Sequence, residues 1–337
     1  MRPPYSTLRR GSGIGTRVLF AATIVMLMPV SACAAPARST ECSDTRLHSL
    51  DHDCLRFGIS TPGGPAALAE FERVAEAARQ TPTLILSFSD FTAPPPIEGL
   101  NAIMSFGAEP VVTWEPWRWL GEDEYDEAAF SMQSIADGLH DDYLYSWADQ
   151  LAAWGRTVYL RFAHEANGTW YPWSVARGTS AETYLEAWRH VHDLFASKGA
   201  DNVKWIWAPN VSFHGSSPIA ELYPGDSYVD VVGVDGYNWG TTHSWSHWID
   251  PASLFGPTLD ELRALAPGKP IVITEVGSAD MGGSKPDWIR ELVTLLDEDT
   301  SVAAFIWFDY DKEADWRFSS TPESAAAFAS ALKERLR

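Results

Sequence analysis

The stretch TVYLRFAHE, residues 157–165, has the composition of a buried β-strand that ends in two ionisable residues. β-Branched and aromatic residues dominate the stretch, and its length suits a single strand. Strands covered on both faces of a parallel sheet have this nearly continuous apolar character, because neither face meets water. His164 and Glu165 therefore stand where such a strand would reach the edge of its sheet.

Seven more runs of this kind occur along the chain: LRFGIS (55–60), TLILSFSDF (83–91), PVVTWEPW (110–117), VKWIWAPN (203–210), VDVVGVDGY (229–237), PIVITEVGS (270–278) and VAAFIWFDY (302–310). Helix-like segments lie between them, at 66–80, 145–155, 181–199, 259–268, 287–298 and 323–337, while the links after 83–91 and 203–210 are less clearly helical. Strands that alternate with helices over about 250–280 residues predict a single-domain (β/α)8 TIM barrel of the α/β class. A doubly wound open sheet is the alternative, although no Gly-rich phosphate loop follows the first run.

Residues 1–32 are predicted to be an export signal. Arginines precede an apolar run at 18–32 that is too short, and too close to the terminus, for a membrane span. The run ends in VSAC, residues 30–33, which resembles a bacterial lipoprotein cleavage site. Lipid on Cys33 would attach the chain to a membrane, and ordinary cleavage beside a nearby alanine is the alternative. We therefore expect an exported protein, either a cell-surface lipoprotein or a secreted one.

Residues 33–54 are predicted to form an N-terminal segment, and residues 55–337 the barrel. If Cys33 carries lipid, Cys42 and Cys54 are the cysteines left, and an oxidising exterior favours a disulfide between them. That bond would tie the N-terminal segment to the start of the first strand.

The charge of the chain narrows the class of partner. The formal net charge is −20, and the signal segment contains arginines but no acidic residue, so the exported chain would be more acidic still. Such a surface repels phosphate backbones, which argues against nucleic acid and is compatible with a neutral polymer. The 16 tryptophans fit a carbohydrate-binding surface or a tryptophan-rich core equally well.

Polar and aromatic residues at strand ends are the candidates for chemistry, since active sites of such barrels lie at the carboxyl ends of the strands. Glu275 follows the uncharged stretch 270–274, and strand alternation places it on the face of Ile271 and Ile273. An ionisable group there is costly unless it is paired or useful, so catalysis and a buried ion pair with Arg161 are the two readings.

Two glutamates at the mouth of one barrel, Glu165 and Glu275, fit glycoside hydrolysis with one general acid and one nucleophile or base. Aromatic rings at the strand ends would stack on sugar rings, and Asn, His and Tyr side chains would bind hydroxyl groups. The candidates for these contacts are His164, Asn167, Trp170, Trp114, Trp117, Tyr237 and Trp307. A zinc motif is excluded because Gly168 stands where the second histidine would be, and no Gly-x-Ser-x-Gly elbow occurs. We expect neither a metal nor a cofactor.

The stretch RFAHEANGTWYPW (161–173) resembles the acid/base signature of glycoside hydrolase family 26, and PIVITEVGS (270–278) resembles the nucleophile strand of that family. Further blocks at 138–155, 205–210, 223–238 and 312–318 are similar too, so the resemblance covers most of the exported chain. It implies a (β/α)8 barrel in which Glu165 is the acid/base and Glu275 the nucleophile. It also implies that His164 holds the reacting sugar, that Tyr237 hydrogen-bonds the nucleophile, and that Trp170 and Trp307 stack on sugars.

Strand alternation places His164 and Glu165 on opposite faces. Both side chains reach one site only if the strand breaks or bulges between them.

The sequence TWEPW, residues 113–117, departs from the family pattern, because mannanases of the family often carry a histidine after the third strand. The chain is more similar to compact members that act on mixed-linkage β-glucan. Glu115 is an additional acidic residue there, which either binds sugar hydroxyls or pairs with Arg118 or Arg161.

The predicted function is that of a retaining endo-β-glycanase acting on a neutral β-linked polysaccharide, either mannan or glucomannan, or mixed-linkage glucan. A non-catalytic lipid-anchored glycan-binding protein, and a transglycosylase with the same carboxyl pair, are the alternatives.

Overall fold

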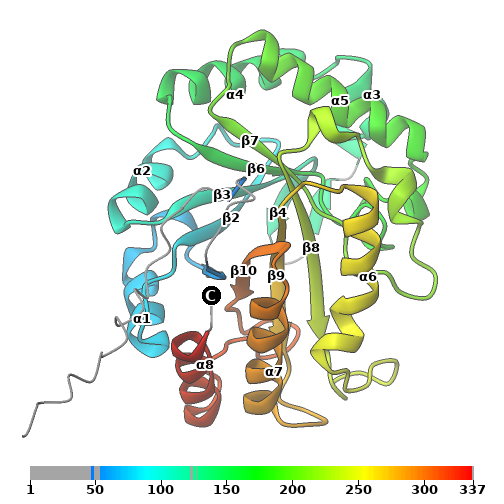
Figure 1. The fold of residues 1–337 in the computed structure, drawn as a ribbon. Helices are drawn as coiled ribbons and strands as arrows, with labels where there is room; N and C mark the ends of the chain where they lie inside the picture. Colours follow the sequence, from blue (N-terminus) through cyan, green and yellow to red (C-terminus); the bar gives the residue numbers. More distant parts are fainter. Residues whose placement is uncertain (1–46, 49–53, 122–123, 127, 336–337) are drawn as a thin grey trace, which may run out of the picture. The chain divides into compact units, whose positions relative to one another are not determined.

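The computed structural model describes residues 47–48, 54–121, 124–126 and 128–335. Eight parallel strands close into a barrel in the order β1-β10-β9-β8-β7-β6-β3-β2 (Figure 1). They are β1 (Arg56–Ser60), β2 (Leu84–Asp90), β3 (Glu109–Glu115), β6 (Val158–Phe162), β7 (Val203–Trp207), β8 (Val231–Asn238), β9 (Ile271–Ser278) and β10 (Val302–Phe308). Because β1 pairs with both β2 and β10, the sheet has no open edge, which confirms the predicted (β/α)8 barrel over the open sheet.

Helices surround the strands on the outside of the barrel. They are α1 (Leu68–Ala78), α2 (Ile97–Phe106), α3 (Met132–Ala136), α4 (Asp141–Trp154), α5 (Ala181–Ser197), α6 (Pro251–Leu265), α7 (Lys285–Glu298) and α8 (Pro322–Glu334). Of the two links with a weak helical pattern, the one after β2 contains α2. The one after β7 contains only the short 3-10 turns Ile219–Leu222 and Asp226–Tyr228.

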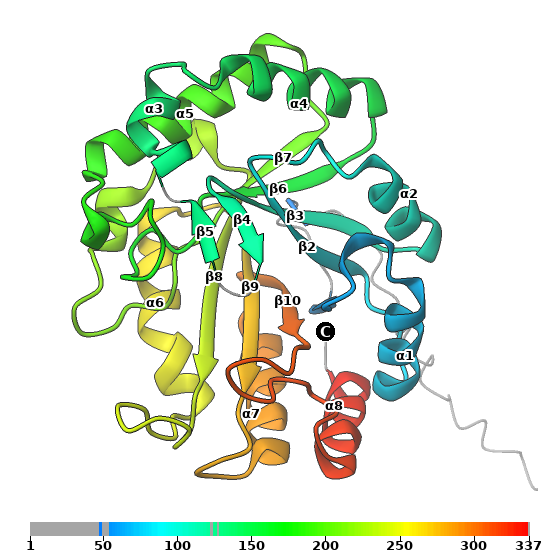
Figure 2. The same ribbon diagram turned by 180° about the vertical axis from the view of Figure 1, so that it is seen from behind.

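A short hairpin after β3 was not predicted from the sequence. Its strands are β4 (Arg118–Gly121) and β5 (Glu124–Asp126), which pair in antiparallel fashion (Figure 2). The hairpin exposes Trp119 and Leu120, and its strands of 4 and 3 residues are too short to give a periodic pattern in the sequence.

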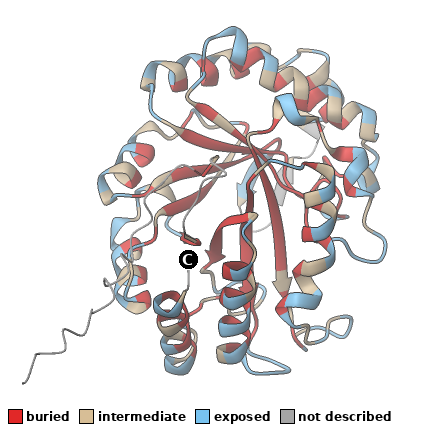
Figure 3. Cartoon of the chain, in the orientation of Figure 1, coloured by how far each residue is buried: buried red, intermediate tan, exposed pale blue. Residues whose placement is uncertain are grey.

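Apolar residues pack in two layers, one inside the barrel and one between the strands and the helices. On β2, for example, Leu84 and Leu86 point inward, while Ile85 belongs to the outer layer. Most residues of the barrel strands are buried, as Figure 3 shows, because both faces of these strands are covered. At the amino-terminal end of the barrel, the backbone N–H of Leu47 donates to the hydroxyl of Tyr159 at 2.9 Å.

The predicted export signal, Cys33 and Cys42 lie outside the described residues, so the lipid anchor and the Cys42–Cys54 pairing stay predictions. Cys54 itself is disulfide-bonded. Among the described residues, none of the helices combines the length and the apolar character that a membrane span requires.

Candidate active site

The turn after β6 brings His164 and Glu165 to one place. The strand ends at Phe162, and the backbone then takes left-handed conformations at Ala163 (φ 45°) and Glu165 (φ 53°). For residues other than glycine this conformation costs roughly 1–2 kcal/mol each, so the surrounding structure must hold it. The strand therefore breaks just before His164, which is the condition for both side chains to face the mouth of the barrel.

Hydrogen bonds from neighbouring segments hold this turn in place. The backbone N–H of Glu165 donates to the carbonyl oxygen of Ala208 at 2.7 Å. The indole of Trp173 donates to the carbonyl oxygen of His164 at 2.6 Å. Both partners are buried, so these bonds form away from competing water and fix the direction of the Glu165 side chain.

A β-bulge in β9 turns Glu275 into the barrel. Val234 pairs with Ile273, but the next residue of β8, Asp235, pairs with Glu275, so Thr274 is the extra residue. A bulge interrupts strand alternation. The expectation that Glu275 shares a face with Ile271 and Ile273 is therefore wrong, because those two residues pack in the outer layer.

Arg161 lies at the centre of a buried charge network. Its Nη1 donates to Asp235 Oδ2 at 2.5 Å, its Nη2 donates to Glu275 Oε1, and its Nε donates to Thr113 Oγ1 at 2.9 Å. Burial opposes the charged guanidinium, but the two carboxylates outweigh burial and hold the pKa of Arg161 above its ordinary value. The expected ion pair between Arg161 and Glu275 thus forms, and it does so inside the candidate site.

The second oxygen of Glu275, Oε2, accepts a hydrogen bond of 2.6 Å from the hydroxyl of Tyr237. The side chain of Glu275 is 8% exposed and lies at the carboxyl end of β9. Two donors thus hold this carboxylate in one orientation, which is the arrangement that a nucleophile requires.

The environment of Glu165 differs from that of Glu275. Asn210 Nδ2 donates to its Oε1 at 2.9 Å, and Trp170 Nε1 donates to its Oε2 at 2.6 Å, so both donors are neutral. Burial, and after it the charge of Glu275, raise the pKa of Glu165 to about 7. Glu165 can therefore hold a proton near neutral pH, as a general acid must.

Glu115 is a third carboxyl group at the mouth. It is 8% exposed at the end of β3, where Trp117 hydrogen-bonds it. Burial, and after it the charge of Glu275, raise its pKa to about 8. The described residues include no ion pair between Glu115 and either Arg118 or Arg161, so a direct salt bridge does not account for it.

His164 is buried beside this network. Its Nε2 lies 3.0 Å from the hydroxyl of Tyr171, whereas Nδ1 has no hydrogen-bond partner among the described residues. Burial, followed by the charge of Arg161, lowers its pKa well below the ordinary range, so the ring is neutral. A neutral ring with a free nitrogen can exchange a hydrogen bond with a sugar hydroxyl.

One atom each of His164, Asp235 and Glu275 lie within 4.8 Å of one another, a spacing that a metal ion could bridge. The guanidinium of Arg161 already binds both carboxylates. A cation placed there would meet that fixed positive charge, so the residues do not fit a metal site.

Of the predicted aromatic contacts, three hydrogen-bond a carboxyl group at the mouth: Tyr237 binds Glu275, Trp170 binds Glu165 and Trp117 binds Glu115. Trp170 is 38% exposed, and its ring stacks on Phe213 with centroids 5.8 Å apart. Trp117 is almost buried and packs edge-on against Tyr171 and Trp173.

Trp114 and Trp307 do not contact the site, so those two predictions are wrong. Both are fully buried in the outer layer: Trp114 stacks on Trp147 with centroids 4.3 Å apart, and Trp307 lies edge-on to Phe328 at 5.4 Å. Strand alternation explains both positions: Thr113 and Glu115, beside Trp114, point into the barrel, and so does Ile306, beside Trp307.

Asn167 is also wrong as a sugar contact. It is fully buried, its Oδ1 accepts from the backbone N–H of Asn210, and its Nδ2 donates to the Asn210 carbonyl oxygen, both at 2.9 Å. Asn167 therefore acts by holding Asn210, which in turn donates to Glu165.

Asn210 and Asp235 are site residues that sequence reasoning missed. Asn210 closes a predicted strand and Asp235 interrupts one, and those positions were the available signal. The pairing of Asp235 with Glu275 depends on the bulge in β9, which no local pattern reveals.

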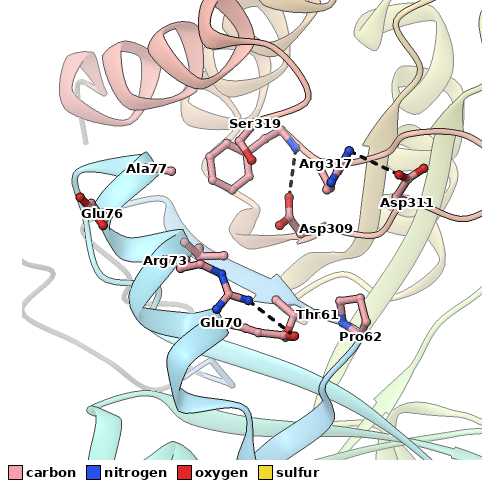
Figure 4. A pocket seen from close by; sticks show the side chains of 12 residues that line it. Thr61, Pro62, Glu70, Arg73, Glu76, Ala77, Asp309, Asp311, Arg317 and Ser319 are labelled. Carbon is pink, nitrogen blue, oxygen red and sulfur yellow. Dashed lines mark hydrogen bonds and ion pairs between the residues drawn. The ribbon is translucent and has the colours of Figure 1, made fainter.

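A groove of about 680 Å³ lies between α1 and the segment after β10, and it contains none of the residues above (Figure 4). Both arginines that line it are paired: Arg73 lies 3.7 Å from Glu70, and Arg317 lies 3.4 Å from Asp311. Asp309 accepts a hydrogen bond from the backbone N–H of Phe318 at 3.1 Å, so it fixes the loop before α8. The groove thus borders the barrel without sharing its catalytic candidates.

Comparisons with known proteins identify the family and the fold. The model of glycosyl hydrolase family 26 matches residues 121–279. The chain is 39% identical over 239 residues to Endoglucanase H of Acetivibrio thermocellus. This match covers 69% of this chain and 25% of that protein. It is 32% identical over 197 residues to mannan endo-1,4-beta-mannosidase A and B of Caldalkalibacillus mannanilyticus. This second match covers 55% of this chain and 33% of that protein.

Among solved structures, the family 26 domain of an endo-beta-mannanase/endo-beta-glucanase from Prevotella bryantii shares the fold, with a TM-score of 0.62 and 15% identity. That match covers 86% of this chain and 91% of the other. The chain spans only 25% and 33% of the two curated relatives above, so they extend well beyond the matched barrel. On the barrel, the sequence blocks and these matches together, the chain belongs to glycoside hydrolase family 26.

Proposed function

We propose that this chain is a retaining endo-β-glycanase that cleaves a neutral β-linked polysaccharide by double displacement. The observation that carries the proposal is the contrast between two buried glutamates at one barrel mouth. Glu165 has neutral donors and a pKa raised to about 7, whereas Glu275 binds a guanidinium and a phenol. Paired carboxyl groups in unlike environments are typical of acid and nucleophile roles.

In the first step, a carboxylate oxygen of Glu275 attacks the anomeric carbon, and the glycosidic C–O bond breaks. Glu165 transfers its proton to the departing oxygen, which leaves as a hydroxyl group. The product is a glycosyl ester on Glu275, and Glu165 is then a carboxylate.

In the second step, Glu165 takes a proton from water, and the water oxygen bonds to the anomeric carbon as the ester bond to Glu275 breaks. Both glutamates return to their first states. The two displacements restore the original anomeric configuration.

Around these steps, Tyr237 and Arg161 hold Glu275 in position. The free Nδ1 of His164 would bind a hydroxyl of the reacting sugar, and the Trp170 ring would contact the sugar next to Glu165. Both assignments follow from where these side chains lie.

Mixed-linkage β-glucan, mannan and glucomannan are the proposed substrates. The relative with 39% identity is named an endoglucanase, and the one with 32% identity a mannosidase. The segment TWEPW, residues 113–117, lacks the histidine that mannanases of the family often carry after the third strand, which favours glucan, so lichenan is the first substrate to test.

The test combines a hydrolysis panel over lichenan, mannan, glucomannan and β-1,3-xylan with NMR of the first product anomer. We expect internal cleavage of at least one polymer and a β-anomer as the first product. An α-anomer would overturn the nucleophile role of Glu275. Binding without cleavage would favour the glycan-binding alternative, and products longer than the substrate would favour a transglycosylase.

We further propose that the chain is exported and that Cys33 carries lipid. The supporting observation is the VSAC sequence at the end of an apolar run. Metabolic labelling with a radioactive fatty acid should label the wild-type protein and leave Cys33→Ala unlabelled, and labelling of both would contradict the proposal.

A further inference from the structure

The loop between β8 and α6 carries an aromatic pair that the proposed chemistry does not use. Trp245 is 67% exposed, and its ring lies parallel to that of His243, with centroids 5.1 Å apart and planes 9° apart. Trp239 contacts both rings, at 5.3 Å from His243 and 5.4 Å from Trp245. We call the pair His243 and Trp245 the distal platform.

Single exposed hydrophobic residues are ordinary on protein surfaces. The distal platform differs, because a second ring covers one face of the indole and most of the residue is still open to solvent. Met281, in the loop after β9, is also 56% exposed, and its carbonyl oxygen accepts from the backbone N–H of Thr241 at 3.0 Å. Figure 2 shows these two loops side by side at the ends of β8 and β9.

The loop that carries the platform is fixed from inside. The buried Asn238 accepts hydrogen bonds on Oδ1 from the backbone N–H groups of Gly240 at 3.2 Å and Ile249 at 3.1 Å. Its Nδ2 donates to Ser278 Oγ at 3.0 Å. One amide thus closes both ends of the loop and ties it to β9.

Gly240 lets the two loops touch. Its φ is +54°, and a Cβ atom there would lie 1.8 Å from the carbonyl oxygen of Met281. Only glycine fits such an approach. The rings are therefore held in place before any ligand arrives, and pre-organised groups lose little conformational entropy on binding.

Aromatic contacts connect the platform to the catalytic centre. Tyr237, which donates to Glu275, lies 5.0 Å from Trp316, and Trp316 lies edge-on to Trp239 at 4.8 Å. Trp239 then contacts Trp245. The platform is thus the exposed end of a series of contacting rings that begins at Tyr237, the hydrogen-bond donor to Glu275.

The barrel order shows that the platform lies at one end of the mouth. β8 and β7 stand between β9 and β6 on one side of the barrel, and β10, β1, β2 and β3 stand between them on the other. A polymer that passes between Glu275 on β9 and Glu165 beyond β6 must leave the mouth on these two sides. The loop after β8 lies on the first of them.

We propose that the distal platform is a sugar-binding subsite, in which Trp245 stacks on a pyranose unit remote from the bond that is cleaved. The inference rests on the proposed function. The ligand of the distal platform is an uncharged β-linked glucan or mannan chain, whose pyranose rings present apolar C–H faces to the flat indole of Trp245. Stacking on an exposed ring needs no charged partner, which agrees with a neutral polymer as ligand.

Trp245→Ala tests the platform against substrates of increasing length. For the polymer and for long oligosaccharides we expect KM to rise roughly two- to tenfold, as the loss of one aromatic contact implies, with kcat nearly unchanged. The shortest oligosaccharide that is cleaved should show wild-type KM. Trp245→Phe keeps a ring and should recover most of the affinity, whereas Trp245→Met keeps hydrophobicity alone and should not.

Trp154→Ala is the matched control. Trp154 ends α4, and β6 begins four residues later at Val158, so Trp154 lies at the amino-terminal end of the strands, away from the mouth. Its loss should leave KM unchanged for every substrate length. A KM change of equal size for all lengths with Trp245→Ala, or no change for any, overturns the platform while the proposed hydrolysis stands.

Binding to the inactive variant separates the two proposals. In the Glu275→Gln background, affinity electrophoresis with lichenan, mannan and glucomannan should show retardation that Trp245→Ala reduces. If the wild-type protein cleaves none of these polymers but Trp245→Ala still reduces binding, the platform stands and the hydrolysis fails. If Trp245→Ala leaves binding unaltered in this background, the platform is wrong whatever the wild-type protein cleaves.

Discussion

Arg161 donates a hydrogen bond to Glu275 from the centre of the barrel, and the same guanidinium holds Asp235 at 2.5 Å. One buried cation thus serves two buried carboxylates. Burial raises the pKa of Glu165 to about 7, and the charge of Glu275 adds to this effect, because it disfavours a second carboxylate nearby. The Arg161–Glu275 pair is therefore a structural element of the barrel, and it contributes to the difference between the two glutamates.

Replacing Arg161 by methionine should lower the free energy of unfolding and abolish activity. Removing one partner of a buried ion pair leaves uncompensated charge, which costs about 3–5 kcal/mol of unfolding free energy. Denaturant titration gives the free energy, and an assay on lichenan gives the activity. Arg56→Met is the control, because Arg56 pairs with Glu109 near the start of β3, away from the mouth. It should lose stability while the folded fraction stays active, and equal activity loss in both variants would contradict the role of Arg161.

Glu165→Gln should lower kcat on polysaccharides by roughly 10²- to 10⁴-fold, the usual contribution of a general acid. A substrate with a good leaving group, such as a dinitrophenyl glycoside, needs less protonation and should lose far less in its first step. The two substrates are compared by single-turnover kinetics. Equal loss on both would mean that Glu165 acts on something other than the leaving oxygen.

The dependence of kcat/KM on pH should reflect the loss of the proton from Glu165. Since the pKa of Glu165 is raised to about 7, kcat/KM on the wild-type protein should fall as pH rises above about 7, where the acid loses its proton. Asn210 donates to Glu165 and lowers its pKa. Asn210→Ala should therefore move this basic limb to higher pH.

Asn167→Ala removes the residue that holds Asn210 and should shift the limb in the same direction, though less. A purely structural role for Asn167 would lower stability without moving the limb. Ser212→Ala, on the exposed part of the same loop, is the control and should leave the profile unchanged.

The raised pKa of Glu115 predicts how the stability of the protein changes with pH. Its pKa is about 8 in the folded protein, against an ordinary value of 4.5, so between these pH values the folded state holds a proton that the unfolded state has lost. The stability from this difference is fully present below pH 4.5 and is lost as pH rises through about 8. Glutamine cannot ionise, so Glu115→Gln should lose this dependence.

We therefore expect the melting temperature of Glu115→Gln, relative to the wild type, to be higher at pH 9 than at pH 5. Scanning calorimetry at both pH values measures it. Glu72→Gln, at an exposed position on α1, is the control and should show no such change. A Glu115→Gln difference that is the same at both pH values would mean that Glu115 is already ionised in the folded state at pH 5.

The sequence sufficed for the barrel and for the position of the two glutamates near the ends of their strands, because buried strands and isolated carboxyl groups at their ends are local patterns. The same patterns misplaced Trp114 and Trp307, since a tryptophan at a strand end points inward or outward according to register, which depends on neighbouring strands. Glu275 shows the limit most clearly. Its position was predicted correctly at the strand end, but its face was wrong, because the bulge at Thr274 arises from pairing with β8.

Residues that act through others were the hardest to predict. Asn167 stands in the most informative stretch of the chain and was taken for a sugar contact, yet both ends of its amide bind the backbone of Asn210. Asp235 was read as part of a strand, and only its ion pair with Arg161, 74 residues away in sequence, reveals its function in the site. Such long-range partners follow from the closed barrel, which no window of sequence contains.

The disulfide of Cys54 gives a prediction about the N-terminal segment. Cys54 is disulfide-bonded, and Cys42 is its expected partner. A disulfide that closes a short loop contributes about 2–4 kcal/mol, largely by restricting the unfolded chain. Cys42→Ser and Cys54→Ser should each lower the unfolding free energy by this amount, and the double variant should lose no more than either single variant, because both remove the same bond. Denaturant titration gives these values, and mass spectrometry of non-reduced peptides identifies the linked pair. A Cys54 peptide linked to Cys33 would contradict the pairing, and the lipid on Cys33 with it.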